Sequence, residues 1–506
     1  MQKKGKLELT WVGKYDEEKP VEPRILLEDT EKSYGDPGSE NMLIHGDNLI
    51  ALQALQQDFA GKVKCIYIDP PYNTGYAFAQ YDDGLEHSLW LSMMRSRLLL
   101  LKSLLSDEGS IWISIDGDEE AYLKVLCDEV FRRENYIATI VWQKRTSPDM
   151  RAVISDGHEY ILVYAKEHDI FKKIRNKLPL SDDQAKNYSN PDNDPRGPWT
   201  SADYTAQGFR PNQMYTITTP GGKQYTPPEG KCWKNVESVF NEQVEDGRIW
   251  FGADGCGMPR RKTFLSEHEG VIPWTWWTNK EVGHTQEAKK ESIKLFGAND
   301  AFDTPKPERL LQRIIHIASN EGDLILDSFL GSATSIAVAH KMGRRWIGIE
   351  LENSAYTHCK TRMDKVIDGE QGGISKAVNW QGGGGYHFYE LAPSLLVKND
   401  KLPVYQINPT YTFEMLCESI CKIEGFKYKL QDVFHGHSSE KRFIHVTTEF
   451  VNAEYIRSLS QHLDEGQSLL IYATKIQSDM MLPDNIKVKK IPKDLLDKCN
   501  FESEVR

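Results

Sequence analysis

The sequence has few cysteines and no long apolar run, and both shortages limit what the protein can be. Its 506 residues contain eight cysteines, none in a C-x-x-C pair, so reduced thiols are favoured over disulfides or a zinc site. No stretch approaches the ~18 consecutive apolar residues of a membrane helix. The lysines of residues 1–6 are not followed by an apolar region, so no secretory signal is expected. These absences predict a cytoplasmic protein that holds no metal.

Positive charge is also in short supply. The chain has 62 lysines and arginines against 74 aspartates and glutamates, a formal net charge of −12. This balance argues against indiscriminate coating of nucleic acid, but it is consistent with a specific enzyme whose basic cleft is local. A G-x-x-x-x-G-K-[ST] phosphate loop is absent as well, which excludes an ATP-driven motor within this chain.

An apolar run that ends in two prolines stands out at residues 64–75, KCIYIDPPYNTG. We interpret it as a buried strand that leads into a turn at Asp69, Pro70, Pro71 and Tyr72. The prolines lack backbone donors and leave carbonyl oxygens as fixed acceptors, while Asp69 adds a carboxylate and Tyr72 a flat aromatic face. Such a turn suits an exocyclic amine of a nucleobase, whose N–H bonds it accepts while the ring stacks on Tyr72. An ordinary strand-to-loop exit explains the same residues.

A second stretch, residues 323–335 with the sequence DLILDSFLGSATS, predicts a nucleoside site. A short strand there leads through a turn of small residues to a helix N-terminus, where backbone N–H groups face a ligand. The next predicted strand ends at Glu350, about 20 residues further on, where nucleotide-binding folds place a carboxylate for ribose hydroxyls. The turn is not GxGxxG and no phosphate-binding lysine follows it. A nucleoside without pyrophosphate therefore fits better than NAD or ATP.

These two stretches resemble motifs of the amino-group DNA methyltransferases, and in particular of the modification subunits of Type III restriction–modification systems. The D-P-P-Y sequence at residues 69–72 resembles the catalytic tetrapeptide of adenine-specific members, and residues 327–334 resemble the S-adenosylmethionine turn D-x-F-x-G-S-G-T. The catalytic motif comes first, which is the circularly permuted order of the beta class. The resemblance runs from Asn41 to Tyr389. Ala333 replaces the usual second glycine, and because a methyl group is small we expect cofactor binding to survive.

The resemblance implies methyl transfer from S-adenosylmethionine to the N6 amino group of a flipped-out adenine in double-stranded DNA. It implies catalytic roles for the four residues 69–72. The positions that it implies for the cofactor are Asp47, Thr304, Lys306, Asp327, Phe329, Gly331, Ser332, Thr334 and Glu350. Asp47 is also a candidate N-cap of the helix that follows it, and a solvated lysine is the alternative for Lys306. His158, Glu159 and Tyr160 receive no role beyond lining the pocket.

Two other functions stay open. Cytosine N4 methylation uses the same geometry, although the family's cytosine members usually have Ser where this chain has Asp69. A non-catalytic DNA-recognition subunit of a larger defence complex could keep the motifs for binding alone. Carbon-5 methylation would need a nucleophilic cysteine, and no Pro-Cys dipeptide occurs.

Alternating strand and helix patterns predict an α/β fold. We expect a doubly wound, Rossmann-like S-adenosylmethionine-dependent methyltransferase sheet, circularly permuted, with an inserted target-recognition domain and a small C-terminal α/β domain. The expected divisions are an N-terminal arm at 1–40, a catalytic half at 41–165, the target-recognition domain at 166–300, a cofactor-binding half at 301–380 and a C-terminal assembly domain at 381–506.

The insertion at 166–300 is rich in Pro, Gly, Asn, Asp and Trp, and such long insertions are more often functional modules than loops. Its cluster of Arg260, Arg261 and Lys262 is suited to phosphates and base edges. The resemblance implies three partners: double-stranded DNA, a second copy of this chain, and a restriction subunit with helicase and nuclease activity on a separate chain. The implied location is the cytoplasm of a bacterium or archaeon, at the nucleoid.

Overall fold

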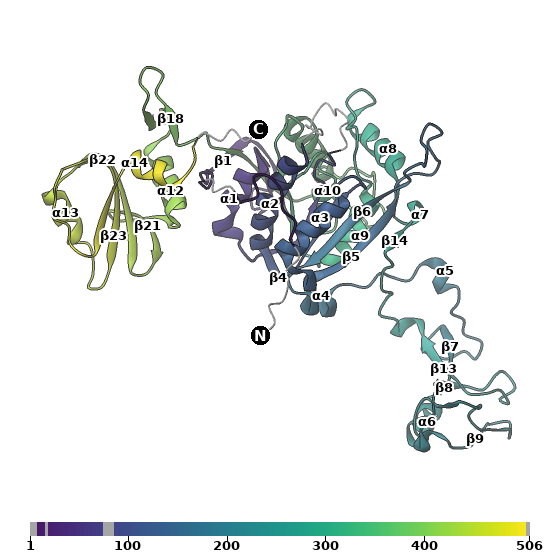
Figure 1. The fold of residues 1–506 in the computed structure, drawn as a ribbon. Helices are drawn as coiled ribbons and strands as arrows, with labels where there is room; N and C mark the ends of the chain where they lie inside the picture. The colour runs from purple at the N-terminus through teal and green to yellow at the C-terminus, as the bar shows by residue number, and fades with distance from the viewer. Residues whose placement is uncertain (1–7, 16–18, 74–85, 502–506) are drawn as a thin grey trace. The chain divides into compact units, whose positions relative to one another are not determined.

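The computed structural model describes residues 8–15, 19–73 and 86–501. Thr74 and Gly75, the end of the proline-containing stretch, lie outside the described residues. The chain divides into two compact units (Figure 1), one spanning Lys177–Pro273 and the other combining the segments on either side, Met1–Asn176 and Trp274–Arg506.

A ten-stranded sheet forms the frame of the larger unit, with the strand order β1-β17-β2-β16-β15-β3-β4-β6-β5-β14. The strands are β1 Leu26–Gly35, β2 Met42–His45, β3 Val63–Ile68, β4 Leu105–Ile115, β5 Tyr136–Gln143, β6 His158–Ala165, β14 Trp276–Trp277, β15 Leu324–Asp327, β16 Arg345–Glu350 and β17 Gly385–Leu391. Only β1, at one edge, and β6 run antiparallel to their neighbours. The predicted α/β fold with its permuted motif order is confirmed.

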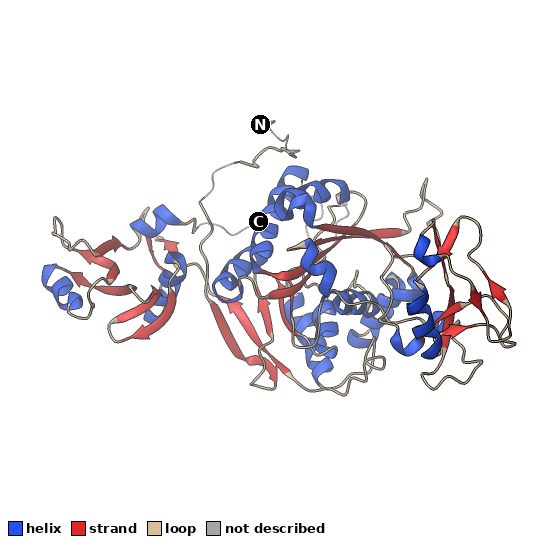
Figure 2. Ribbon diagram, turned by 90° about the horizontal axis from the view of Figure 1, so that it is seen from below, coloured by secondary structure: helices blue, strands red, loops and turns tan. Residues whose placement is uncertain are grey.

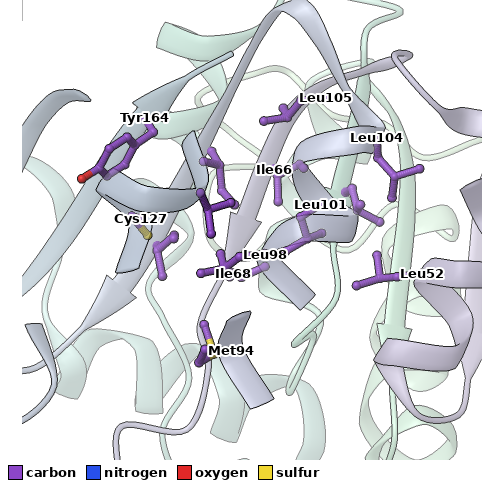
Figure 3. Packing of buried hydrophobic residues seen from close by; sticks show 14 of the residues in the cluster. Leu52, Ile66, Ile68, Met94, Leu98, Leu101, Leu104, Leu105, Cys127 and Tyr164 are labelled. Carbon is purple, nitrogen blue, oxygen red and sulfur yellow. The ribbon is translucent and has the colours of Figure 1, made fainter. Parts of the chain in front are cut away.

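Helices flank this sheet on both sides (Figure 2). They are α1 Asn48–Phe59, α2 His87–Leu104, α3 Glu120–Cys127, α4 His168–Ile174, α7 Asn279–Val282, α8 Thr285–Phe296, α9 Glu308–Ala318, α10 Thr334–Lys341 and α11 Thr361–Ile367, with π-helical turns at Asp128–Arg132 and Ala355–Lys360 and a 3₁₀ turn at Arg133–Asn135. Leu52 of α1 and Leu98 of α2 are fully buried in one apolar cluster with Ile66 and Ile68 of β3 (Figure 3). Side chains of this size each contribute about 1.5–3 kcal/mol when buried, so this cluster fixes the strand that ends at the D-P-P-Y turn.

Two expectations about the edges of the frame are wrong. The N-terminal arm contains β1, which pairs with β17 from Leu26 opposite Leu391 to Gly35 opposite Gly385. β17 in turn pairs with β2, so the frame continues to Leu391 and does not end at residue 380. Together the two strands move the edge of the sheet from β2 to β1, whose side chains are polar and half-exposed.

The smaller unit is built from short strands around an aromatic core. Its elements are α5 Asp182–Ala185, β7 Trp199–Asp203, β8 Thr205–Gln207, β9 Ile217–Thr218, β10 Gln224–Tyr225, β11 Lys231–Trp233, α6 Glu237–Glu245, β12 Ile249–Trp250 and β13 Arg260–Phe264, with 3₁₀ turns at Pro211–Gln213 and Leu265–Glu267. Tyr204, Trp233 and Phe240 lie at its centre. The unit spans Lys177–Pro273 and is therefore shorter in sequence than the insertion expected at 166–300. α4 and β14 belong to the larger unit, where β14 pairs with β5 and Trp277 is fully buried.

The C-terminal part contains a five-stranded mixed sheet in the order β20-β21-β22-β23-β24. Its elements are β18 Leu396–Lys398, β19 Tyr405–Ile407, α12 Phe413–Glu424, β20 Lys427–Gln431, β21 Phe434–Ser439, β22 Arg442–Val451, α13 Ala453–Ser460, β23 Ser468–Ile476, β24 Ile486–Lys490 and α14 Lys493–Lys498. Two apolar clusters of its own, one around Ile420 and Tyr472 and one around Ile456 and Ile471, show that this part has an independent core.

Within the described ranges, no helix combines the length and apolarity that a membrane crossing requires. The same residues include no group of three or more His, Cys, Asp or Glu side chains arranged to hold a metal ion.

A buried ionic network joins α9, α10 and α11 beside the predicted cofactor turn. Glu308 is the first residue of α9, and it lies 2.9 Å from Lys341 Nζ of α10 and 2.9 Å from Arg362 Nη2 of α11. The backbone N–H of Ile374 donates to Glu308 Oε2 at 3.0 Å. All three charged side chains are essentially inaccessible, so each depends on the others for the interactions that it has lost with water.

Removal of Glu308 should therefore destabilise the frame strongly. Glu308→Ala leaves Lys341 and Arg362 buried without their main counter-charge, which costs about 3–5 kcal/mol. We expect the melting temperature to fall by roughly 6–20 °C, at the 2–4 °C per kcal/mol found for domains of about 150–250 residues. The matched control is Glu40→Ala, whose partner Arg345 is half exposed; an exposed pair contributes under about 1 kcal/mol. Equal melting temperatures for the two variants would contradict this assignment.

Candidate active site

The predicted functional carboxylates gather at one edge of the central sheet. β2, β3, β15 and β16 are mutually parallel, so their carboxyl ends lie at the same edge. Asp69 follows β3, while Asp327 and Glu350 end β15 and β16. Asn48, just after β2, donates to the carbonyl of Ser328 at 2.8 Å. The fold therefore brings the D-P-P-Y turn, the small-residue turn and the Gly-Asp-Asn turn at residues 46–48 together, at the edge of the sheet where α/β folds bind ligands.

Asp69 is held by two neighbours. The Lys306 ammonium lies 2.9 Å from Oδ1 and 2.7 Å from Oδ2, and the Tyr72 hydroxyl lies 2.8 Å from Oδ1. A carboxylate offers about four acceptor positions, so the contacts among the described residues leave one position on Oδ2. Asp69 can hold Lys306 and accept a further N–H at the same time.

Glu159, at the start of β6, is a residue whose importance the sequence did not reveal. Its Oε2 lies 3.0 Å from the Tyr72 hydroxyl and 3.5 Å from Lys306 Nζ, and its Oε1 lies 3.4 Å from Lys144 Nζ. Because β6 is antiparallel to β4, its first residues lie at the sheet edge that holds Asp69. A search of the sequence for polar residues at the ends of strands misses Glu159, because it lies at the start of a strand.

The charges in this group shift one another's pKa values. Burial raises the pKa of Asp69, and the Glu159 carboxylate adds to the rise, although the nearby Lys306 cation opposes it. Burial would raise the pKa of Glu159, but Lys306 and Lys144 outweigh burial and hold that pKa below its ordinary value. Burial lowers the pKa of Lys306, yet the two carboxylates outweigh it and raise that pKa. Lys306 is therefore a cation, and the pKa values of the two carboxylates move in opposite directions, upward for Asp69 and downward for Glu159.

The two prolines and Tyr72 are fixed by neighbours as well. The carbonyl of Pro71 accepts a hydrogen bond from the indole of Trp90 at 2.8 Å, and Trp90 is fully buried at the start of α2. Pro70 is buried, whereas Pro71 and Tyr72 are half-buried. The Tyr72 hydroxyl contacts both carboxylates, and burial raises the Tyr72 pKa well above its ordinary value. Tyr72 is thus a neutral phenol, and the contacts of its hydroxyl with the two carboxylates fix the position of its ring.

The small-residue turn is shaped by Asp327 and Glu350. Asp327 accepts from the backbone N–H of Phe329 at 2.9 Å and from the Ser335 hydroxyl at 2.5 Å. Glu350 accepts from the backbone N–H of Gly331 at 2.6 Å, and Gly331 has a φ of +56°. Both carboxylates are buried. They face this turn as predicted, and their ligand contacts stay a prediction.

The remaining members of the turn face the interior. Ser332 and Thr334 are buried, and their hydroxyls lie 3.1 Å apart. Arg362 donates to Thr334 Oγ1 at 2.7 Å and to the Ser332 carbonyl at 3.1 Å. Their hydroxyls therefore support the turn from beneath. One buried polar atom at the turn, the hydroxyl of Ser328, has no hydrogen-bond partner among the described residues.

Asp47, Thr304 and Lys306 were all expected to contact the cofactor, and the structure gives Asp47 and Lys306 other partners within the protein. Asp47 is the N-cap of α1, where Oδ1 accepts from the N–H groups of Leu49 and Ile50, and its Oδ2 lies 3.2 Å from Arg97 Nη2. The N-cap alternative is therefore confirmed for Asp47. Thr304 is exposed. Lys306 points at Asp69 and is not a solvated lysine.

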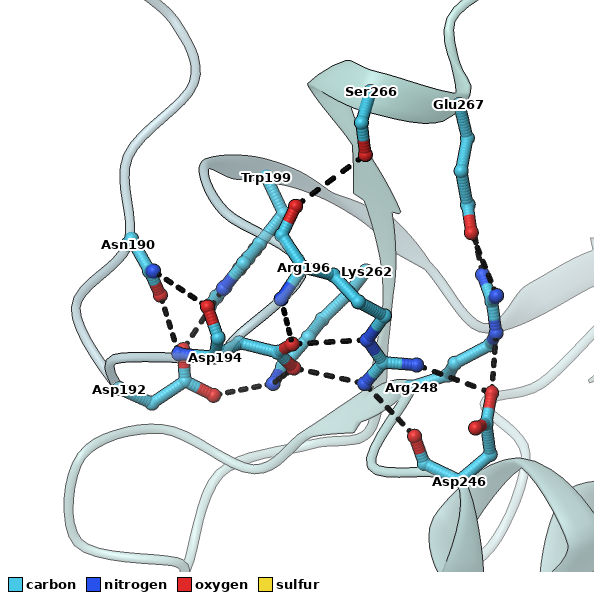
Figure 4. A network of polar contacts seen from close by, with 10 residues as sticks. All are labelled: Asn190, Asp192, Asp194, Arg196, Trp199, Asp246, Arg248, Lys262, Ser266 and Glu267. Carbon is cyan, nitrogen blue, oxygen red and sulfur yellow. Dashed lines mark hydrogen bonds and ion pairs between the residues drawn. The ribbon is translucent and has the colours of Figure 1, made fainter.

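In the smaller unit, the predicted basic cluster is divided by its strand. Lys262 of β13 is 4% exposed, and its ammonium contacts Asp192 and, at 3.0 Å, Asp194 (Figure 4). The prediction that Lys262 contacts DNA is wrong, because the side chain is enclosed by these two carboxylates. Arg260 and Arg261 are exposed, and Arg260 pairs with Asp203 at 2.7 Å.

Comparison with known proteins agrees with this nucleoside-binding class of α/β fold. The sequence matches the model of the DNA methylase family over residues 63–361, more than half of the chain. The protein belongs to this family.

Three relatives show how far the similarity extends. The probable type III restriction-modification enzyme HindVI Mod subunit of Haemophilus influenzae is 32% identical over 78% of this chain and 59% of its own length. The type III restriction-modification enzyme StyLTI Mod subunit of Salmonella typhimurium is 36% identical over 59% of this chain and 49% of its own length. The type II methyltransferase M.EcaI of Enterobacter cloacae is 30% identical over 68% of this chain and 75% of its own length. The chain thus spans 59% of one Mod subunit and 49% of the other.

The buried carboxyl of Asp327 predicts a dependence of stability on pH. Burial raises its pKa to about 7, above the ~3.9 of an unfolded chain. The folded state therefore binds this proton more tightly, and the stability that it contributes is complete below pH ~4 and lost as pH rises to about 7. The melting temperature of Asp327→Asn minus that of the wild type should thus become more positive between pH 4.5 and 8. Parallel melting curves across this range would contradict the assignment.

Proposed function

We propose that this chain methylates the N6 amino group of adenine in double-stranded DNA and uses S-adenosylmethionine as methyl donor. The observation that carries the proposal is the position of Asp69, at the carboxyl end of β3 next to the turn that follows the adjacent strand β15. An acceptor for an amine and a turn suited to a nucleoside thereby lie side by side at one edge of the sheet.

The residues around the turn fit the donor. Glu350 suits ribose hydroxyls, and the backbone near Gly331 allows close approach. The Ser328 hydroxyl, which is buried and has no hydrogen-bond partner among the described residues, is a polar group that a ligand could satisfy. When bound, S-adenosylmethionine supplies a methyl group activated by its sulfonium. Lys306 is engaged by Asp69 at 2.7 Å, so we propose that its first role is to hold that carboxylate, in place of the cofactor contact that the resemblance implied.

Asp69 is proposed to orient the target amine. Its free acceptor position on Oδ2 takes one N–H of the flipped-out base, and the carbonyl of Pro70 takes the other. These bonds turn the nitrogen lone pair out of conjugation with the ring. After methyl transfer the nitrogen must lose a proton, and Asp69 is suited to receive it because burial has raised its pKa. Most of the rate enhancement comes from this positioning.

The choice of adenine rests on Asp69 as the first residue of the tetrapeptide, since the cytosine members of the family resembled usually have Ser there. The similarity to two Mod subunits supports a role as the modification subunit of a Type III or related system. We propose that it acts as a homodimer in the bacterial or archaeal cytoplasm, on nucleoid DNA, with cleavage left to a restriction subunit on another chain.

Substitution of the central carboxylate tests the chemistry. Asp69→Ala should lower methylation by at least about 10²-fold, the cost of one lost transition-state contact, while S-adenosylmethionine binding stays within a few-fold. The measurement is single-molecule sequencing of DNA from cells that express the wild type or the variant, combined with calorimetric cofactor binding. Methyl-adenine at one short motif in the wild type alone would establish reaction, base and site. Undiminished methylation in the variant would refute the role of Asp69, and cofactor binding without any methylation by the wild type would favour the recognition-only function.

The smaller unit is proposed to recognise DNA through its exposed arginines. Arg261→Ala should weaken binding and lower the slope of log K against log salt by about 1, the expected effect of one lost phosphate contact. For comparison, Lys262→Met should leave the salt slope of the folded protein unchanged, because Lys262 is enclosed. It should instead lower the stability of this unit, because Asp192 and Asp194 lose their shared cation. Binding by fluorescence anisotropy at several salt concentrations measures the slope. An unchanged slope for Arg261→Ala would remove this residue from the interface.

A further inference from the structure

The loop that connects β5 to β6, residues 144–157, carries three large apolar side chains into solvent. Met150, Val153 and Ile154 are 90%, 103% and 88% exposed. Single exposed apolar residues are ordinary on protein surfaces, but a cluster in one loop indicates a surface that another molecule covers. The proposed chemistry uses none of the three.

The base of this loop is held firmly. The backbone N–H groups of Lys144 and Arg145 donate to the carbonyl of Gly157 at 3.0 and 3.3 Å. Thr285, at the start of α8, donates to the Lys144 carbonyl from its backbone N–H at 3.2 Å and from its hydroxyl at 3.0 Å. Within the loop, the N–H of Asp149 donates to the Ser155 hydroxyl at 2.7 Å. The apolar tip is therefore presented on an ordered base.

Contacts at that base lead directly to the catalytic group. The Lys144 ammonium lies 3.1 Å from Asp156 inside the loop and 3.4 Å from Glu159. Glu159 contacts Tyr72 of the D-P-P-Y turn at 3.0 Å. The loop thus emerges from the sheet edge that holds Asp69, so a duplex whose base reached Asp69 would pass close to it.

The surroundings of the tip suit a polyanion. Arg145 and Arg151 line a hollow of about 270 Å³ at the loop, together with Asp149 and the side chains of Thr285 and Gln286. Arg151 pairs with Asp149 at 3.0 Å, and both Arg151 and Arg145 are exposed. Arginine is the side chain best matched to phosphate geometry. Arginines beside apolar side chains are a combination that minor-groove DNA-binding proteins use to unstack a base step.

We propose that this loop inserts an apolar side chain, from Met150, Val153 or Ile154, into the double helix at the space that the flipped-out base leaves. The inference rests on the proposed DNA methylation, because it presumes that a base is extruded. Extrusion breaks stacking and pairing at a cost of a few kcal/mol. An apolar side chain in the vacated space restores contacts with the neighbouring bases and hinders the base from returning.

The test compares two DNA substrates with the full-length protein. The first duplex carries the target adenine in a normal pair, and the second carries an abasic site opposite it, so that its extrusion costs less. The variant combines Met150→Ala, Val153→Ala and Ile154→Ala. The matched control is Met481→Ala, an equally exposed methionine of the C-terminal part, 96% accessible. Methylation rates are measured on both duplexes, and 2-aminopurine at the target position reports extrusion without turnover.

We expect the triple variant to methylate the paired duplex at least about tenfold more slowly than the wild type, and the abasic duplex within about threefold, since insertion matters most where extrusion is costly. The rise in 2-aminopurine fluorescence on the paired duplex should shrink in parallel, and Met481→Ala should match the wild type. Equal losses on both duplexes, or no loss on the paired one, would overturn the inference. A wild type that methylates neither duplex would refute the proposed function, and the 2-aminopurine comparison would still decide the insertion.

Discussion

Four charged side chains at the carboxyl edge of the central sheet hold the site together. Lys306 and Asp69 are 237 positions apart in sequence, and their contact joins the segment before the inserted unit to the segment after it. Glu159 and Lys144 complete the group, with two positive and two negative charges. Because these side chains are largely removed from water, each charge depends on the others to replace its lost hydration. The group therefore places the D-P-P-Y turn, the start of α9 and the base of the β5–β6 loop relative to one another, and any ligand chemistry at Asp69 occurs within its field.

The sequence predicted the position of candidate site residues that lie at the carboxyl ends of parallel strands. Asp69, Asp327 and Glu350 each follow an apolar run, and parallel pairing brings such ends to one edge whatever the intervening length. Glu159 was missed for the converse reason: it begins an antiparallel strand, and a start reaches that edge only when the direction of the strand is known. The direction of β6 is set by its pairing with β4 and β5. This pairing belongs to the tertiary structure and cannot be predicted from the local sequence of β6.

Lys262 and the sheet edges illustrate two further limits. A run of three basic residues in a strand cannot share one face, because successive side chains alternate; Lys262 lies on the buried side with Phe264, whereas Arg261 is outside. That alternation was a usable signal, but the partners that make burial tolerable, Asp192 and Asp194, lie about 70 residues earlier. β1 was not predicted as a strand for a different reason. Its LLEDTEKSYG sequence is polar and half-exposed, so only its pairing with β17 makes it a strand.

Ala333, the one departure from the family motif, has a physical counterpart in the structure. It has a φ of +60° and no accessible surface, a conformation that costs a residue with a Cβ about 1–2 kcal/mol and that glycine adopts freely. Strain of this kind persists only where the surroundings over-determine it. Here Arg362 bonds on both sides of Ala333, to the Ser332 carbonyl and the Thr334 hydroxyl, and Arg362 is itself fixed by Glu308. The network that connects three helices therefore also holds the turn in the shape that glycine would have adopted unaided.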